Sequence, residues 1–495
     1  MNMTVKKNIG IIGAGLSSLY AACMLSKKGY DVTVYEKNSM AGGRSQTFSA
    51  NGFTFDMGPS WYWMPDLIDK LFLDIGEERE QYYGLHRLDP AYKIFWQDKE
   101  TSEIPVNDQA LYDLFDTFEK NGGEKLTKFL KSAKKKYNIA LSDFIENPGL
   151  SLFELIKLKA IKGAFHLDIF KSVEKDVSNR FLSEKARSIL NFPVLFLGAM
   201  PDKIPSMYTL MNFADLKLGT WYPDGGMNSI ASALEKIAVK NGVKFHYNCP
   251  ITSIESNMGA VTGIVSANGF EKFDYVISGA DYHFTEQKLL QQNHRRYSED
   301  YWDKRSMAPS SLIFYLGVDK KVANLNHHNL FFDESLKAHG DTIYSNKNWP
   351  EKPLFYACVP SITDDSVAPA NQENIFILIP IAPNIEDSEA TRDKYLDYVL
   401  DKLKLHTGED IRENITYKRS FCVADFKSEY NSFKGNAYGL ANTINQTANL
   451  KPKIKSKLKN VFFCGQLTVP GPGIPPALIS GKIAANQILQ NEGNI

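Results

Sequence analysis

An N-terminal glycine motif constrains this chain of 495 residues more than any other feature. Residues 8–18 form a short apolar run, a glycine turn at Gly13-Ala14-Gly15 and the beginning of a helical run. A second apolar run, residues 32–35, follows. This order predicts a βαβ unit that holds a dinucleotide. Gly13 allows the tight turn, and Gly15 lets the backbone approach a pyrophosphate at the positive end of the helix.

An acidic residue after the second run supports the same interpretation. Glu36 lies about 20 residues beyond the glycine turn, where a carboxylate accepts hydrogen bonds from a ribose, and we assign its neighbour Lys37 to the same site. Ser18 stands where the motif has its third glycine. Because serine is small, we expect the close packing of helix on strand to survive, slightly loosened.

A second glycine motif addresses the choice between NAD and FAD, which the first motif leaves open. Gly42 and Gly43 precede Arg44, and Gly58 follows shortly afterwards. Flexible backbone beside a fixed cation suits a phosphate and the close approach of a flavin, although such a pairing also arises by chance. Together the two motifs resemble the N-terminus of FAD-binding amine-oxidase-like flavoproteins. That resemblance implies FAD, with Gly43, Arg44 and Gly58 among its contacts.

The C-terminus carries a more specific pattern. An apolar run at 460–464 ends at Gly465, and a proline–glycine run at 470–476, which includes Gly473 and Ile474, leads into a helical run. Backbone N–H groups at a helix N-terminus favour partial negative charge, such as that of a flavin carbonyl. The stretch resembles the closing signature of bacterial-type phytoene desaturases and related carotenoid desaturases. This resemblance implies that Gly465, Gly473 and Ile474 contact FAD.

The resemblance covers nearly the whole chain. Further matching motifs lie at residues 197–201, 208–210, 219–227, 360–364, 368–369 and 379–380. Ser18 and the pair Gln466-Leu467 depart from the family pattern, and both departures touch the flavin region. The resemblance also places Ile251 at the adenine end of FAD; an ordinary core position is the alternative interpretation.

The family pattern, rather than periodicity, implies the domain organisation. We expect an α/β protein with a discontinuous Rossmann-like FAD-binding domain at residues 1–104, 216–298 and 416–495. An α+β substrate domain is inserted at residues 299–415. A helical segment at residues 105–215, rich in Leu, Phe and Lys, contributes to the substrate site or docks on a membrane.

Lysines in that helical segment suggest contact with a membrane surface. A run without intervening acid contains Lys125, Lys128, Lys131, Lys134, Lys135 and Lys136, and residues 152–165 mix apolar side chains with further lysines. The pattern suits a helix on an anionic lipid surface, but a core-facing helix with a solvated lysine face fits it equally well. No apolar run is long enough to span a bilayer. The insolubility of carotenes favours peripheral membrane association.

Composition argues against several other functions. Basic and acidic residues balance at 57 each, so no attraction to nucleic acid is implied. The five cysteines form no C-x-x-C pair, and their odd number, with no signal peptide, favours a reducing cytoplasm. His327-His328 reads as an exposed pair in a loop, and no ligand spacing suggests a metal.

The resemblance implies a hydrocarbon substrate, and this substrate limits the chemistry that the site can use. It has no polar group, so removal of hydrogen from adjacent carbons needs a well-placed hydride acceptor, which oxidised flavin supplies. We expect an apolar tunnel with residues 61–64 in its wall, or else in the ordinary core. Glu154 and Lys157 lie three residues apart on a predicted helix and are candidate catalytic residues. A solvated ion pair is the alternative for these two residues.

The sequence therefore predicts an FAD-dependent carotenoid desaturase that converts phytoene stepwise towards lycopene. Oxygen or a membrane quinone would reoxidise the flavin. Carotene isomerases, and desaturases or terminal oxidases of later carotenoids, share the same motifs. These functions therefore stay open as alternatives. A non-enzymatic prenyl-binding escort protein is a further alternative, which a colourless protein without flavin would favour. The motifs do not determine the oligomeric state.

Overall fold

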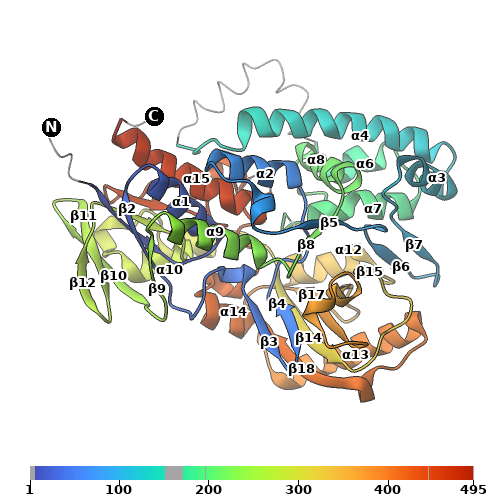
Figure 1. Cartoon of the computed structure of the whole chain (residues 1–495). Helices are drawn as coiled ribbons and strands as arrows, with labels where there is room; N and C mark the ends of the chain where they lie inside the picture. The colour runs from blue at the N-terminus through green and yellow to red at the C-terminus, as the bar shows by residue number, and fades with distance from the viewer. Residues whose placement is uncertain (1–5, 151–170, 196, 444, 494–495) are drawn as a thin grey trace.

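The computed structural model describes residues 6–150, 171–195, 197–443 and 445–493, and a parallel sheet forms the core at the N-terminal end. Its strand order β19-β13-β1-β2-β9 corresponds to Val461–Phe463, Tyr275–Ser278, Asn8–Ile12, Asp31–Tyr35 and Lys244–His246. Every neighbouring pair is parallel. Strands β19, β13, β1 and β2 are mostly buried because helices α1 (Leu16–Lys27), α9 (Ser229–Lys240) and α15 (Ile474–Asn491) cover the sheet (Figure 1), whereas the edge strand β9 is partly exposed.

The two ends of the chain meet in this sheet. Only β13 separates β1 from β19, although more than four hundred residues separate these strands along the chain. Helices α1 and α15 pack very closely, because a Cβ on Gly481 would lie 2.0 Å from the backbone oxygen of Ser17. The predicted fold class, with a discontinuous dinucleotide-binding core, is therefore confirmed.

A seven-stranded mixed sheet forms the second layer of the molecule. Its order is β18-β14-β17-β16-β15-β6-β7, formed by Ile415–Phe421, Ser310–Val318, Glu373–Ile381, Phe355–Cys358, His328–Phe332, Lys93–Trp96 and Thr101–Glu103. Along β14, Leu312, Phe314 and Leu316 pack in the core beneath α13 (Glu389–Thr407). The alternate residues Ile313 and Tyr315 face the main core on the other side. The period of two thus gives this sheet one face for α13 and one face for the rest of the protein.

The strands of this sheet cross the predicted domain boundaries. β6 and β7 precede residue 104 but pair within the seven-stranded sheet, and β18 begins at Ile415 and pairs with β14. The chain thus contributes to the seven-stranded sheet before and after residues 299–415. The division into domains itself stays a prediction.

A layer of helices covers one side of the molecule (top right of Figure 1). Its helices are α3 (Asp108–Phe118), α4 (Gly122–Ile139), α6 (Val173–Ser178), α7 (Glu184–Leu195) and α8 (Leu210–Phe213). The turn from α3 to α4 needs Gly122, because a Cβ there would lie 2.0 Å from the backbone oxygen of Phe115. In the described part of the chain, no helix has both the length and the apolar character that crossing a bilayer requires.

Smaller elements connect these layers. The other strands are β3 (Thr47–Ala50), β4 (Phe53–Asp56), β5 (Leu85–Arg87), β8 (Trp221–Pro223), β10 (Ile251–Asn257), β11 (Ala260–Ser266) and β12 (Gly269–Lys272). The other helices are α2 (Pro65–Asp74), α10 (Tyr282–Phe284), α11 (Glu299–Asp303), α12 (Leu336–Gly340) and α14 (Val423–Tyr430). The hairpin of β3 and β4 directs the following residues, 57–64, toward the space between the two large sheets.

Candidate active site

A cavity of about 860 Å³ extends between the parallel sheet, the seven-stranded sheet and the helical layer. One part is lined by backbone and polar groups around Gly13, Gly15, Glu36, Gly43 and Arg44, and we call these five residues the cradle. The other part, which we call the apolar arm, is lined by Trp61, Trp63, Met64, Phe192, Met207, Tyr208, Leu210, Met211, Leu330, Phe332 and Leu378. One continuous space therefore joins a polar region to an apolar region.

Glycines shape the cradle. Gly13 has φ +86°, and a Cβ there would lie 3.2 Å from the backbone nitrogen of Ala280. Gly15 precedes α1 with no side-chain cap and no acidic residue in the first turn, and nothing lies within 4 Å of where its Cβ would be. The N–H groups of this first helical turn thus face open space, where an anion is favoured. A Cβ on Gly43 would lie 3.2 Å from the Cα of Gly15, so the two glycine motifs meet.

The serine in place of the third glycine has a structural explanation. Ser18 is fully buried in α1, and its Oγ would lie 2.0 Å from a Cβ on Gly279, just after β13. The glycine that permits close packing of helix and strand is thus on the neighbouring strand. The packing expected from the motif is present, with the small residue in a different position.

Glu36 closes the cradle at the end of β2. Its side chain is buried and accepts hydrogen bonds from the backbone N–H of Ala14 at 2.7 Å and of Asn38 at 2.9 Å. Burial raises the pKa of Glu36, and these two N–H groups oppose that rise. Lys37 also lines the cavity, with its Nζ donating to the backbone oxygen of Ser428 at 2.6 Å.

Arg44 brings the positive charge of the cradle. Its guanidinium donates to Ser432 Oγ at 3.0 Å and lies 5.1 Å from the ring centre of Tyr430, whereas its Nε has no hydrogen-bond partner. Burial lowers the pKa of Arg44, and Asp281 opposes that change. A Cβ on Gly58 would lie 2.7 Å from the backbone oxygen of Arg44, so Gly58 permits this close approach. A partly buried cation whose buried Nε–H is free is suited to a phosphate group.

The C-terminal segment supplies a second helix N-terminus to the same cavity. Gly473 has φ +113° and precedes α15, which has no side-chain cap and no acidic residue in its first turn. Gly465, Gly473 and Ile474 all line the cavity. Gly465 is held by its own N–H, which donates to Ser480 Oγ at 3.0 Å. The cavity thus lies between the N-termini of α1 and α15, and this arrangement fits a dinucleotide whose ring carries a partly negative carbonyl oxygen.

The predicted cofactor residues are brought together. Gly13, Gly15, Glu36, Lys37, Gly43, Arg44, Gly58, Ile251, Gly465, Gly473 and Ile474 line the cavity, and the Ala14 N–H binds Glu36. Glu154 and Lys157 lie outside the described residues. Among the residues that the structure describes, the carboxylates lining the cavity are Glu36, Asp281 and Glu429. Asp281 interacts with Arg44, and Glu429 adjoins Tyr430, so all three lie near the cradle.

Aromatic rings form the wall of the apolar arm. Trp61 stacks on His328 with ring centres 4.1 Å apart and contacts Tyr92 and Phe192. Trp61, Trp63 and Met64 line the cavity as expected. Tyr62 follows the other alternative, an ordinary core position: it is fully buried away from the cavity, with its hydroxyl 3.0 Å from that of Tyr83. Alternate side chains of this extended segment point in opposite directions, so Tyr62 cannot face the cavity together with its neighbours.

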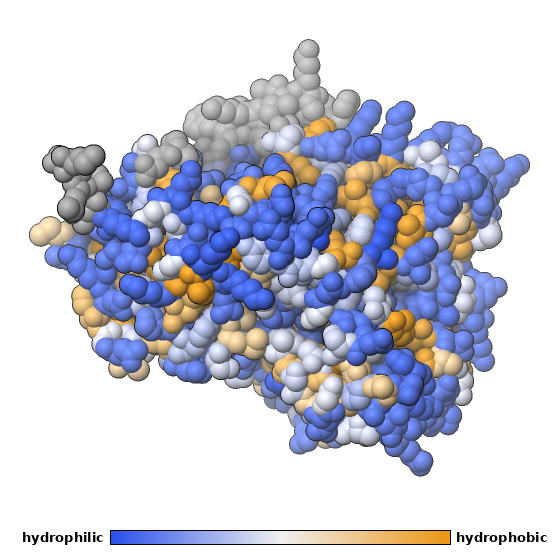
Figure 2. Space-filling model, viewed as in Figure 1, coloured by the Kyte–Doolittle hydropathy of each residue, from blue (hydrophilic) through white to orange (hydrophobic). Residues whose placement is uncertain are grey.

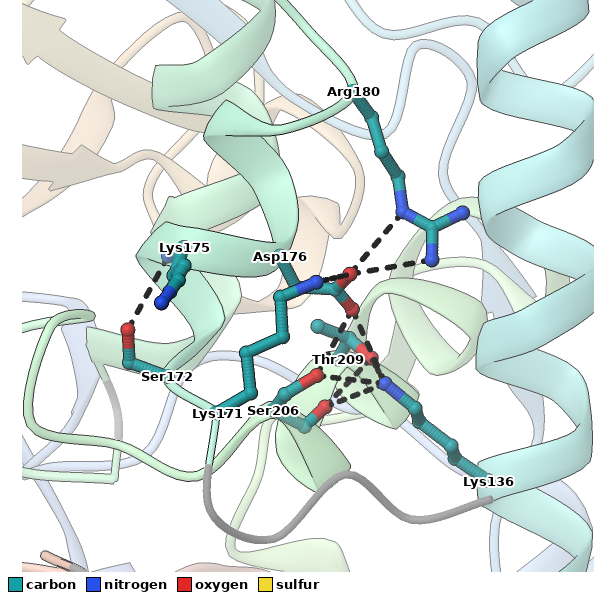
Figure 3. Close-up of polar contacts among 8 residues, drawn as sticks. All are labelled: Lys136, Lys171, Ser172, Lys175, Asp176, Arg180, Ser206 and Thr209. Atoms are coloured by element: carbon teal, nitrogen blue, oxygen red, sulfur yellow. Dashed lines mark hydrogen bonds and ion pairs between the residues drawn. The ribbon is translucent and has the colours of Figure 1, made fainter. Parts of the chain in front are cut away.

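A buried ion pair that the sequence did not reveal holds part of this wall in place. Lys136 of α4 and Asp176 of α6 are each 1% exposed, with Lys136 Nζ 3.2 Å from Asp176 Oδ2. Figure 3 shows Lys136 reaching toward Asp176, Ser206 and Thr209. Lys136 Nζ donates to the hydroxyl groups of Ser206 at 2.8 Å and Thr209 at 3.1 Å. Residues 206–209 include the cavity-lining residues Met207 and Tyr208 and are followed directly by Leu210, which also lines the cavity.

Three cations surround the carboxylate of this pair. Asp176 also accepts hydrogen bonds from Lys171 at 2.8 Å and Arg180 at 3.2 Å. Burial alone would raise the pKa of Asp176, but Lys171, Lys136 and Arg180 together hold it below its usual range.

The predicted lysine cluster is accordingly not one surface. Lys136 is buried, and Lys125 and Lys128 pair with Glu119 and Glu124, which precede the run in the sequence. Lys131, Lys134 and Lys135 are exposed. A prediction based on the run alone missed these acidic partners because they lie outside it.

The histidine pair also differs from the prediction. His327 and His328 are 4% and 0% exposed, because β15 lies between β16 and β6 inside the seven-stranded sheet. His339, which no motif singled out, lines the cavity. Burial lowers the pKa of His339 to about 4, although its hydrogen bond to the backbone oxygen of Pro380 opposes this. A neutral imidazole bound to backbone on both nitrogens is a structural residue rather than a base.

Comparison with known proteins adds independent findings. The family model described as flavin containing amine oxidoreductase matches residues 14–489. A carotenoid 3,4-desaturase of Haloarcula japonica is 35% identical over 98% of this chain and 98% of its own length. A 4,4'-diapophytoene desaturase of Staphylococcus haemolyticus is 29% identical over 98% of this chain and 99% of its own.

A solved structure has the same fold. An oxidoreductase from Methanosarcina mazei aligns with a TM-score of 0.64, covering 98% of this chain and 100% of its own, at 17% identity. At that identity the similarity concerns the fold alone.

Proposed function

The chain belongs to the family of flavin-containing amine oxidoreductases, and from this premise we propose that it is an FAD-dependent desaturase of carotenoid precursors. Family membership, the oxidoreductase class and FAD as cofactor, all predicted from the motifs, are confirmed. The observation that carries the proposal is the continuity of the cradle with the apolar arm inside one cavity. A cofactor held at the cradle would share its space with a long apolar ligand.

The residues of the cradle fit FAD. The pyrophosphate would lie at the N-terminus of α1 beside Gly15 and Arg44, and the ribose near Glu36. The flavin ring would lie toward Gly473 and the N-terminus of α15. When bound, oxidised flavin supplies the hydride acceptor.

The chain itself contributes binding, orientation and exclusion of water. A polyene offers no hydrogen-bonding group, so the aromatic and aliphatic wall of the apolar arm must hold it by burial and shape. No carboxylate among the described residues lines the apolar arm, so a proton released there would have to leave by another route. Glu154 and Lys157 stay candidates for that proton.

Two substrates are proposed. Phytoene, desaturated stepwise towards lycopene, is the first, and the Staphylococcus haemolyticus relative, named a 4,4'-diapophytoene desaturase, supports it. A later carotenoid is the second candidate, because the relative with 35% identity is named a carotenoid 3,4-desaturase. Oxygen or a membrane quinone is proposed as the electron acceptor.

Peripheral contact with a membrane is also part of the proposal. It would bring the apolar arm to substrate dissolved in lipid, and the exposed lysines Lys131, Lys134 and Lys135 supply cations on α4. Figure 2 shows hydrophobic side chains scattered among hydrophilic ones on the face viewed. Charge rather than one broad apolar patch would therefore dominate docking on that face. Sedimentation with anionic and neutral vesicles tests this: we expect binding to the anionic vesicles alone, weakened by salt.

Turnover with a panel of carotenoids tests the proposed function. Flavin-loaded protein is given phytoene or lycopene in liposomes under air, and the pigments are separated. A shift of absorption to longer wavelength with phytoene supports the first candidate, and a shift with lycopene alone supports the second. Flavin-loaded protein that removes hydrogen from neither would contradict the proposal, and protein that binds no flavin would favour the escort alternative.

A further inference from the structure

Two neighbouring strands bring three metal-binding side chains together behind the wall of the apolar arm. His328 begins β15 and lies directly opposite Cys358, the last residue of β16. His327 precedes β15, and the Val359 N–H donates to its backbone oxygen at 2.8 Å. One ring nitrogen of each histidine and the Cys358 Sγ all lie within 4.8 Å of one another. The strand register itself therefore holds this group of three side chains in place.

The hydrogen bonds of the two histidines leave one nitrogen of each ring free. His327 Nδ1 lies 2.8 Å from Thr363 Oγ1, and His328 Nδ1 lies 2.6 Å from Tyr356 Oη. Because the Tyr356 hydroxyl donates to Ser60 Oγ at 3.0 Å, His328 Nδ1 is the donor and its Nε2 carries a lone pair. Both Nε2 atoms are buried without a hydrogen-bond partner. Buried unpaired nitrogens are rare, whereas metal-binding histidines are typically held through their other nitrogen.

The surroundings provide space and charge for a cation. A small cavity of about 20 Å³, enough for one water molecule, is lined by His327, Cys358 and the segment that contains Asp56. A Cys358 thiolate would balance one of the two charges of a dication.

We propose that His327, His328 and Cys358 bind a zinc ion, with both imidazoles ligating through Nε2. Zinc takes nitrogen at about 2.0–2.1 Å and sulfur at about 2.3 Å, so the three ligand atoms would move together by roughly 1 Å. Water in the small cavity would complete a tetrahedral shell. Bound zinc would fix the ring of His328, on which Trp61 stacks, and through Tyr356 it would fix Ser60.

Metal analysis of the full-length, flavin-loaded protein tests this inference independently of the proposed function. We compare wild type with Cys358→Ser and with Cys422→Ser, a cysteine that is equally buried but lies outside the group. After equilibration with zinc and removal of excess, we expect about one equivalent in wild type and Cys422→Ser, and at least a tenfold loss in Cys358→Ser. His328→Gln should lose zinc as well. Flavin content and circular dichroism show whether each variant is folded.

Cobalt substitution supplies a second readout, which reports the thiolate directly. Chelator-treated wild type and Cys422→Ser should develop an intense thiolate-to-cobalt absorption on addition of Co²⁺, whereas Cys358→Ser should not. Wild type that binds neither zinc nor cobalt would overturn the proposal. Folded Cys358→Ser with undiminished zinc would overturn it too.

Discussion

The cradle and the helical wall of the apolar arm are built by opposite means. In the cradle, missing side chains create the site: Gly13 adopts a left-handed backbone, and the space beside Gly15 is open. In the helical wall, side chains create the structure, because Lys136 and Asp176 form a buried ion pair with two hydroxyl groups. The first region is specified by backbone geometry close together in the sequence, and the second by contacts between distant residues. Variants should therefore affect the two regions differently.

The largest expected effect is on the helical wall. Replacing Lys136 by Met leaves Asp176 buried with two cations instead of three, and should lower the free energy of unfolding by about 3 kcal/mol. Lys128→Met is the matched control on the same helix, because Lys128 is exposed and should matter by less than about 0.5 kcal/mol. Urea unfolding of flavin-free protein measures both. Equal effects of the two variants would show that the buried ion pair does not stabilise this wall.

A pair of glycine variants separates backbone strain from ligand space in the cradle. Gly15→Ala meets no protein atom, so flavin-free stability should change by less than about 1 kcal/mol while FAD affinity falls roughly tenfold or more. Gly13→Ala must adopt a positive φ against the Ala280 backbone, and should cost about 1–3 kcal/mol even without flavin. Flavin titration and urea unfolding of both variants give the comparison. Loss of flavin-free stability in Gly15→Ala would contradict the open space beside it.

The difference between local contacts in the cradle and distant contacts in the helical wall explains which features the sequence could predict. The Ala14–Glu36 contact spans 22 positions inside one βαβ unit, so a local motif predicts it. The contacts of Lys136 with Ser206 and Thr209 span 70 and 73 positions, and a lysine run alone favours a solvated face. The same limitation applies to the histidine pair, because burial of β15 depends on its neighbours in the sheet. Glu154 and Lys157 stay predictions, since they lie outside the described residues.

A smaller effect is expected where the cradle uses a side chain. Glu36→Gln keeps an acceptor for the Ala14 N–H but removes the charge, so FAD affinity should fall roughly tenfold, or about 1.4 kcal/mol, with little change in folding. Lys37→Met, directly beside it, should weaken FAD less because Lys37 binds Ser428 at the surface. Flavin fluorescence titration measures the two affinities. The reverse order would mean that Glu36 does not contact the ribose.

A pH-dependent effect distinguishes two buried carboxylates, Asp176 and Asp215, which are each 1% exposed. Burial raises the pKa of Asp215 to about 7, although Tyr92 donates to it, whereas the cations hold the pKa of Asp176 low. Asp215 therefore contributes to the free energy of unfolding below about pH 4, and this contribution is lost as the pH rises toward 7. Asp176 contributes above about pH 4, and its contribution is lost as the pH falls below that value.

Unfolding at pH 5 and pH 8 tests this difference. Asp215→Asn should reduce the loss of stability between the two pH values by about 1–2 kcal/mol, whereas Asp176→Asn should be destabilised at both. An unchanged pH dependence in Asp215→Asn would show that Asp215 does not titrate in this range.

The most direct test of a cavity shared by flavin and polyene is a single turnover without oxygen. Flavin-loaded protein is mixed anaerobically with the carotenoid that it converts in air, and flavin absorption and pigment are followed together. The shared cavity predicts that flavin absorption bleaches at the same rate as desaturated product forms, with one double bond per flavin reduced. Product formed while the flavin stays oxidised, or flavin that bleaches without product, would contradict transfer between two ligands of one cavity.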